Sequence, residues 1–109
     1  MSKKATLPYD VRLECIAYVR GYQRRVCADG LTPPDYQRIW AVDYAISRCG
    51  EDIASIKIRE QLVQAIIQNC QGKHKYGRCR LFIPGISERT FSRKKEQFLT
   101  DIAKYCGLV

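Results

Sequence analysis

Apolar residues in the first quarter of the chain recur at the period of an α-helix. Between Tyr9 and Cys27 they stand at positions i, i+4, i+7, i+8, i+11 and i+15, which are Val11, Cys15, Tyr18, Val19, Tyr22 and Val26. This spacing puts them all on one stripe of a helix, whereas a half-buried strand would alternate at every second residue. The pattern stops at Asp29-Gly30, so the sequence predicts one helix before this turn.

Glycine and proline divide the following residues into further helical segments. Threonine caps a helix and proline fits its first turn, so Thr32-Pro33-Pro34 predicts a helix start. Helices are expected over residues 34–49, 51–71 and 88–106, each followed directly by a glycine, with Ile53 and Ile56 either in the third helix or in a separate first turn before it. The residues expected to face inward are Ile39, Val42, Ile46 and Cys49 in the second helix, with Trp40 and Tyr44 beside them, and Leu62, Ala65, Ile66 and Cys70 in the third.

Two segments lack a helical pattern. Residues 1–8 predict a short disordered lead, and residues 73–86 predict a structured loop because they contain two glycines and a proline. The chain has 109 residues, of which 46% are hydrophobic, and this fits one folded domain. The sequence therefore predicts a single all-α domain over residues 9–109, a small bundle of four to five helices.

Positive charge is concentrated in one stretch of the chain. The net charge is +8, and residues 73–95 carry eight basic residues against one acidic residue, Glu88. The remainder has eleven basic and ten acidic residues and is nearly neutral. A basic cluster of this kind favours a polyanionic partner, nucleic acid before membrane, over a merely solvated surface.

The last expected helix separates an apolar face from a polar one. Ser87 stands where its side chain can cap the first turn. The apolar side holds Phe91, Phe98, Leu99, Ile102 and Cys106. The exposed polar residues expected to contact DNA are Arg89, Thr90, Ser92, Arg93, Lys94 and Gln97. A major groove admits one α-helix, where arginine pairs with guanine and glutamine with adenine, so this face predicts base contacts.

The basic loop before this helix predicts a different kind of contact. Its cations are Lys73, Lys75, Arg78 and Arg80. Dense charge on a glycine-broken backbone suits phosphates better than base edges. The loop is therefore expected to add affinity without sequence preference.

The C-terminal stretch resembles a known family. The run GISERTFSRKKEQFL over residues 85–99, followed by Ile102-Ala103 and Gly107-Leu108, is similar to the end of phage regulators of the RinA and ArpU type. The resemblance implies a prophage-encoded transcriptional regulator with a sigma-factor-like helix-turn-helix, here over about residues 58–106. It implies that Ser87 caps the recognition helix and that Phe91 and Phe98 anchor it. It also implies that Arg89, Thr90, Arg93 and Lys94 face DNA.

One departure from the helix-turn-helix pattern concerns the link before the last helix. Such motifs join their helices by three or four residues, whereas fifteen residues separate Gln71 from Ser87 here. Either a short helix lies within residues 76–82, or the unit is a variant with a loop or wing.

Other chemistries find less support in the residues. Cys70, His74 and Cys79 supply three zinc-type ligands without the usual paired spacing, so no metal or other cofactor is expected. His74 has no nearby acid to orient it, and no phosphate-binding or hydrolase motif is present, so no enzyme is expected. The six cysteines lack paired spacing, and the N-terminus lacks an apolar stretch. A reduced, cytoplasmic protein of a bacterial or phage-infected cell is expected, with no membrane span.

The sequence features are compatible with several partners. Double-stranded DNA is the expected ligand, with RNA polymerase and a second copy of the chain as further candidates. Tyr76, Phe82 and Tyr105 suit the stacking of single-stranded bases in RNA. The tyrosines of the first helix, Tyr9, Tyr18 and Tyr22, suit a protein-interaction module. A DNA-packaging subunit of a phage is a related alternative. The amino-acid sequence does not indicate which DNA sequence is bound, or whether the chain activates or represses transcription.

Overall fold

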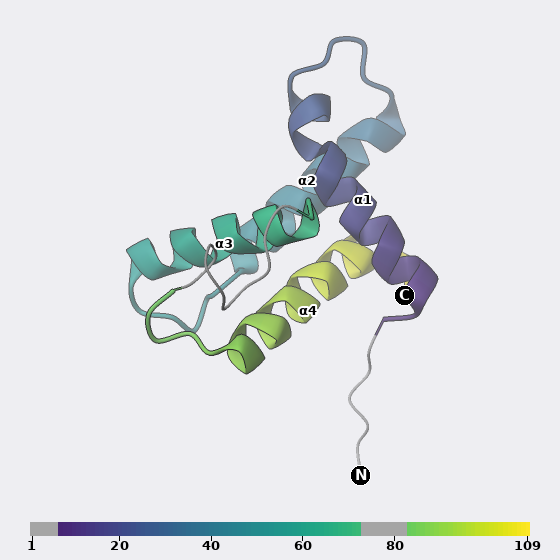
Figure 1. Ribbon diagram of the computed structural model, residues 1–109. Coiled ribbons are helices and arrows are strands. Elements are labelled where there is room, and N and C mark those ends of the chain that lie inside the picture. The colour runs from purple at the N-terminus through teal and green to yellow at the C-terminus, as the bar shows by residue number, and fades with distance from the viewer. Residues whose placement is uncertain (1–6, 73–82) are drawn as a thin grey trace.

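The computed structural model describes residues 7–72 and 83–109, and these residues form four helices and no strand. The helices are α1 (Tyr9–Val26), α2 (Pro33–Arg48), α3 (Ile56–Cys70) and α4 (Glu88–Tyr105). Figure 1 shows α3 and α4 extending to the same side of α1. The expected all-α fold with four to five helices is confirmed. The expectations for residues 1–6 and for loop residues 73–82 lie outside the described residues.

Local capping groups set the helix ends. The Ser87 side chain accepts a hydrogen bond from the Thr90 amide at 3.1 Å, as expected for an N-cap. Gly107 follows α4 with φ at 73°, a left-handed conformation that glycine adopts without steric cost. The amide of Leu108 then donates to the Ala103 carbonyl at 2.8 Å. This pattern closes the last turn as a Schellman motif and fixes where the helix stops.

The third helix begins later than its sequence pattern indicated. Residues 51–55 form turns and bends, and α3 starts at Ile56 behind the cap Ser55, whose oxygen accepts from the Ile58 amide at 3.3 Å. The Ile53 amide donates to the Gly50 carbonyl at 2.8 Å, and the Arg59 side chain donates to the Ile53 carbonyl at 2.6 Å. These hydrogen bonds pair backbone groups of the turn before α3. The residues of the turn therefore do not depend on helical hydrogen bonds to pair these groups.

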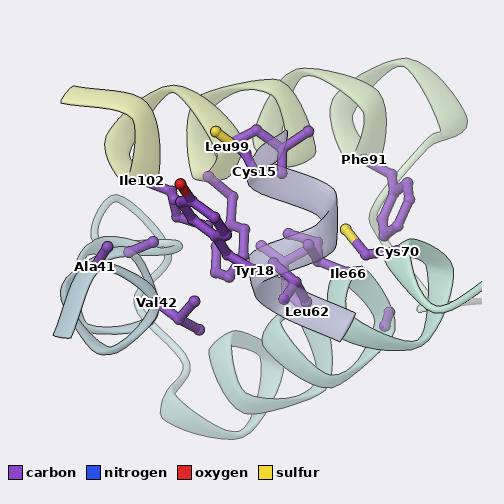
Figure 2. Packing of buried hydrophobic residues seen from close by; sticks show 14 of the residues in the cluster. Cys15, Tyr18, Ala41, Val42, Leu62, Ile66, Cys70, Phe91, Leu99 and Ile102 are labelled. Carbon is purple, nitrogen blue, oxygen red and sulfur yellow. The ribbon is translucent and has the colours of Figure 1, made fainter. Parts of the chain in front are cut away.

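All four helices contribute to one core. Figure 2 shows their side chains directed into a single cluster. Its fully buried members include Cys15 and Val19 of α1, Val42 of α2, Leu62 and Ile66 of α3, and Phe98, Leu99 and Ile102 of α4. Helix α4 packs most extensively on α2 and α1, and α3 packs on α1 and α4. The position of α4 in this bundle leaves its opposite face toward solvent.

The buried face of α2 differs from the one expected. Ala41, Val42 and Ala45 are fully buried, whereas Ile39 and Ile46 are only half-buried. Helix α2 packs against both α4 and α1, and small side chains such as alanine let helix backbones approach closely. The inward stripe is therefore rotated toward the alanines, and the aromatic residues of α2 lie farther outside than its apolar pattern suggested.

Buried thiols make the cysteines unequal in reactivity. Within residues 7–72 and 83–109 the cysteines are free thiols; Cys15 and Cys70 are buried and Cys27 is exposed. Burial raises the pKa of Cys15 to about 12 and that of Cys49 to about 11. Only the thiolate attacks an alkylating reagent, so a raised pKa lowers the reactive fraction at neutral pH.

Alkylation with iodoacetamide at pH 7.5 is expected to label Cys27 well before Cys15 or Cys70. Peptide mapping by mass spectrometry, at increasing reaction times, measures the order. Adding denaturant is the control, since unfolding should bring all described cysteines to similar rates. Equal labelling of Cys15 and Cys27 in the native protein would contradict the burial of Cys15.

A candidate nucleic-acid interface on helix α4

The exposed side of α4 carries a row of polar and cationic side chains. Arg89, Arg93 and Gln97 stand at i, i+4 and i+8 and are all exposed, as is Lys104 further along. On an α-helix this spacing aligns side chains on one face. Phe91, Phe98 and Ile102 lie on the opposite face and are buried. The expected separation of faces in α4 is thus present, and we call the row of Arg89, Arg93, Gln97 and Lys104 the α4 strip.

The cations of this strip form no close ion pair, although Asp52 lies near enough to Arg93, and Asp101 near enough to Lys104, for a weaker electrostatic interaction. Within the part of the chain that the structure describes, no carboxylate lies within 4.0 Å of Arg89, Arg93 or Lys104. The undescribed residues 1–6 and 73–82 contain no aspartate or glutamate. The positive charge of the strip therefore remains available to an anionic partner.

Two of the residues expected to contact DNA have partners within the chain, whereas Ser92 is exposed beside the strip. Thr90 is half-buried; its amide donates to the Ser87 hydroxyl oxygen at 3.1 Å, and the Ser87 hydroxyl donates to the Thr90 hydroxyl oxygen at 3.1 Å. The Lys94 amine donates to the Asp52 carboxylate at 2.5 Å, and the Lys94 side chain is 13% exposed. The same hydrogen bond holds the pKa of Asp52 below its usual value. Lys94 thus links α4 to the α2–α3 connection, whereas Arg89 and Arg93 face solvent.

A groove runs along the side of the α4 strip. Its volume is about 750 Å³, and Arg48, Asp52, Arg93, Gln97 and Lys104 are among its lining residues. Among its lining residues, the Arg48 Nε atom lies 3.6 Å from an Asp101 oxygen. Burial raises the pKa of Asp101, while the Arg48 guanidinium acts in the opposite direction. The groove is therefore lined by four cations, Arg48, Arg93, Lys94 and Lys104, and by three acids, Asp52, Glu96 and Asp101, each of which is paired with a cation.

Sequence reasoning missed Arg48 and Lys104 as part of this surface. Both lie outside the basic stretch 73–95 that drew attention to the C-terminal third. Lys104 stands seven residues after Gln97, so helical spacing alone could have placed it on the strip. Nothing in the sequence indicated that Arg48, at the end of α2, would lie beside α4.

Three contacts hold α4 in place from its flanks. Glu96 forms an ion pair with Arg12 of α1 and accepts a hydrogen bond from the Leu7 amide at 3.3 Å. On the other flank, the Lys95 amine donates to the Asn69 side-chain oxygen of α3 at 2.6 Å. Together with the buried phenylalanines these contacts fix the rotation of α4 about its axis. A rigidly held helix presents its exposed side chains in one geometry, which recognition requires.

The link between α3 and α4 spans residues 71–87. It is much longer than the turn of a compact helix-turn-helix. The cations Lys73, Lys75, Arg78 and Arg80 all fall on its undescribed residues, as do His74 and Cys79. The expected contacts of this loop, and the helix-turn-helix unit over residues 58–106, therefore stay predictions.

The described residues offer little for metal chemistry. Among them, no group of three or more histidine, cysteine, aspartate or glutamate side chains is placed to hold a metal ion. Cys70 is buried in the core, with 2% of its surface exposed. Nor is any helix in the described ranges both long and apolar enough to cross a membrane.

No protein-family model, curated protein or solved structure matches this chain.

Proposed function

We propose that this chain binds double-stranded DNA by placing the start of α4 in the major groove. The observation that carries the proposal is the exposed and aligned set Arg89, Arg93 and Gln97 directly behind the Ser87 cap, whose two arginines form no close ion pair. The first turns of a helix reach base edges most readily, and the free amides of its N-terminus favour a phosphate. Arginine and glutamine supply the bidentate pairs that distinguish guanine and adenine.

The role of the DNA contact follows from the resemblance of residues 85–109 to phage regulators of the RinA and ArpU type. On that basis we propose regulation of transcription, with RNA polymerase as a further partner. Recognition of DNA during phage packaging would use the same helix and is the alternative role.

A binding titration tests the proposal. The chain is titrated with duplex DNA, single-stranded DNA and duplex RNA of equal length, each at two salt concentrations. We expect a clear preference for duplex DNA and an affinity that falls steeply with salt, because bound cations release counterions from the phosphates. Weak binding whose affinity depends neither on the salt concentration nor on the type of nucleic acid would contradict the proposal.

Neutralising the basic loop is expected to weaken binding to all duplexes alike. Replacing Lys73, Lys75 and Arg78 together with glutamine removes three phosphate contacts, which lowers the slope of log K against log salt by roughly three. Fluorescence anisotropy with specific and random duplexes measures both slopes.

A control for this prediction neutralises exposed cations elsewhere. Arg24 of α1 and Lys57 of α3 are both exposed, and their replacement with glutamine should leave the slope nearly unchanged. An unchanged slope in the loop variant as well would show that the loop does not contact DNA.

A further inference from the structure

Four aromatic side chains form a row on the surface of the molecule. Tyr36, Trp40 and Tyr44 stand at i, i+4 and i+8 on α2, with 43%, 53% and 38% of their surfaces exposed. Tyr105 of α4, 41% exposed, continues the row, since its ring centroid lies 5.4 Å from that of Tyr44. The centroids of Tyr36 and Trp40 are 5.7 Å apart. We call these four residues the aromatic row.

The setting of the row differs from that of the α4 strip. Helix α2 carries two acids and two arginines, Asp35, Asp43, Arg38 and Arg48, so its net charge is zero. Pro33, Gln37 and Ser47, which are neutral, are exposed on the same helix. One cation adjoins the row, since the Arg48 guanidinium carbon lies 5.6 Å from the centroid of the Tyr44 ring. Half-exposed tyrosine, tryptophan and arginine on a helix without net charge are typical of a protein–protein interface, whereas binding of a nucleic-acid backbone needs several cations along its path.

The row also matches itself under two-fold rotation. Tyr36 and Tyr44 are each four residues from Trp40, so two α2 helices that pack antiparallel about Trp40 place each Tyr36 near the other copy's Tyr44. Side chains at i, i+4 and i+8 form one ridge, and ridges of this kind interdigitate when helices cross at about −50°. Two-fold interfaces need a self-complementary patch of this sort.

The helix dipoles favour the same antiparallel arrangement, because antiparallel packing places the positive end of one helix toward the negative end of the other. The terminal charges of α2 add little to this preference, since Asp35 is 3.8 Å from Arg25 and Arg48 is 3.6 Å from Asp101 within the same chain. A parallel arrangement would instead place like ends of the two dipoles side by side.

We propose that the aromatic row is the contact between two copies of this chain, with their α2 helices antiparallel. The dimer carries two α4 strips. Where the proposed DNA binding holds, it would therefore recognise two half-sites in inverted orientation. The dimer contact itself rests only on the aromatic row, and it is tested in the absence of DNA.

Sedimentation equilibrium tests the proposal on the full chain from low to several hundred micromolar. The mass is expected to rise from 12.6 kDa toward twice that value. Trp40 is the only tryptophan in the chain, so its emission should shift to shorter wavelength over the same concentration range. A mass that stays at one copy throughout would overturn the proposal, as would quenching of Trp40 by single-stranded oligonucleotides in a chain that stays monomeric.

Trp40→Ala is expected to weaken dimerisation roughly 30-fold or more, since tryptophan at an interface centre is a typical hot spot. Tyr9→Ala is the matched control, because Tyr9 is an aromatic residue of α1 that is 75% exposed and lies outside the row. It should change the dimer dissociation constant by less than about twofold. Circular dichroism checks that both variants keep their helices. Equal weakening by the two variants would overturn the proposal.

The antiparallel arrangement has a test of its own. Tyr36→Ala and Tyr44→Ala are measured singly and together. If each Tyr36 contacts the other copy's Tyr44, either change removes the same pair of contacts, so the double variant weakens dimerisation less than the product of the two single effects. Independent effects that multiply would overturn the antiparallel arrangement.

Discussion

Replacing Phe98 with alanine is expected to lower the free energy of unfolding by about 3–5 kcal/mol. Phe98 is the largest of the fully buried side chains, with 1% of its surface exposed, and it lies in the middle of α4. The substitution removes its apolar contacts and leaves a cavity that the neighbouring helices fill only in part. A small domain has a total stability of only about 5–15 kcal/mol, so much of it would be lost.

Urea denaturation followed by circular dichroism measures the change. Phe91→Ala, at the first turns of the same helix, is expected to lose a similar amount, since Phe91 is also buried. The control pair is Ile66→Ala and Ile56→Ala in α3, where Ile66 is fully buried and Ile56 is 67% exposed. Ile66→Ala should cost about 2–5 kcal/mol and Ile56→Ala less than about 0.5 kcal/mol. A Phe98 variant as stable as the Ile56 variant would mean that α4 does not pack as described.

The buried face of α4 could be predicted because its signals are local. The spacing of Phe91, Phe98 and Ile102 gives the helical period, and Ser87 and Gly107 mark its ends. Each of these signals acts within a few residues of the backbone it determines. The same reasoning placed the exposed arginines of the α4 strip on the opposite face.

Contacts between distant residues could not be predicted in this way. The ion pairs of Lys94 with Asp52 and of Arg48 with Asp101 depend on which helices lie next to each other. A helical period shows that a face is buried but not which helix covers it. For this reason the sequence alone predicts that Lys94 is a free cation of α4, whereas in the structure its amine donates to the Asp52 carboxylate.

The aromatic row shows a second limit of periodicity. Trp40 and Tyr44 were expected beside the buried stripe of α2, because large apolar residues usually define the inner face of a helix. In the structure the small side chains Ala41 and Ala45 are buried instead, on a helix that packs against α4 and α1. Close helix packing thus left the aromatic rings on the surface, where they form the proposed dimer contact.

Replacing Arg89 or Arg93 with alanine is expected to weaken binding to a preferred duplex by about 1–3 kcal/mol per substitution. Both side chains are exposed, one turn apart on the α4 strip, and no carboxylate among the described residues lies within 4.0 Å of either. A bidentate contact to a guanine would be lost with the guanidinium, so the loss on random DNA should be smaller. The fold should survive, because neither side chain belongs to the core.

Competition binding with a selected site and with random duplex DNA measures this difference. Arg24→Ala is the matched control, since Arg24 is an exposed arginine of α1, outside the α4 strip, and its replacement removes the same charge. It should lower the affinity for both duplexes only slightly and by the same factor. If Arg89→Ala and Arg93→Ala behave like Arg24→Ala, α4 contributes no base contacts and the proposed recognition helix is wrong. If they weaken only the selected site, the sequence preference of the chain arises from the first two turns of α4.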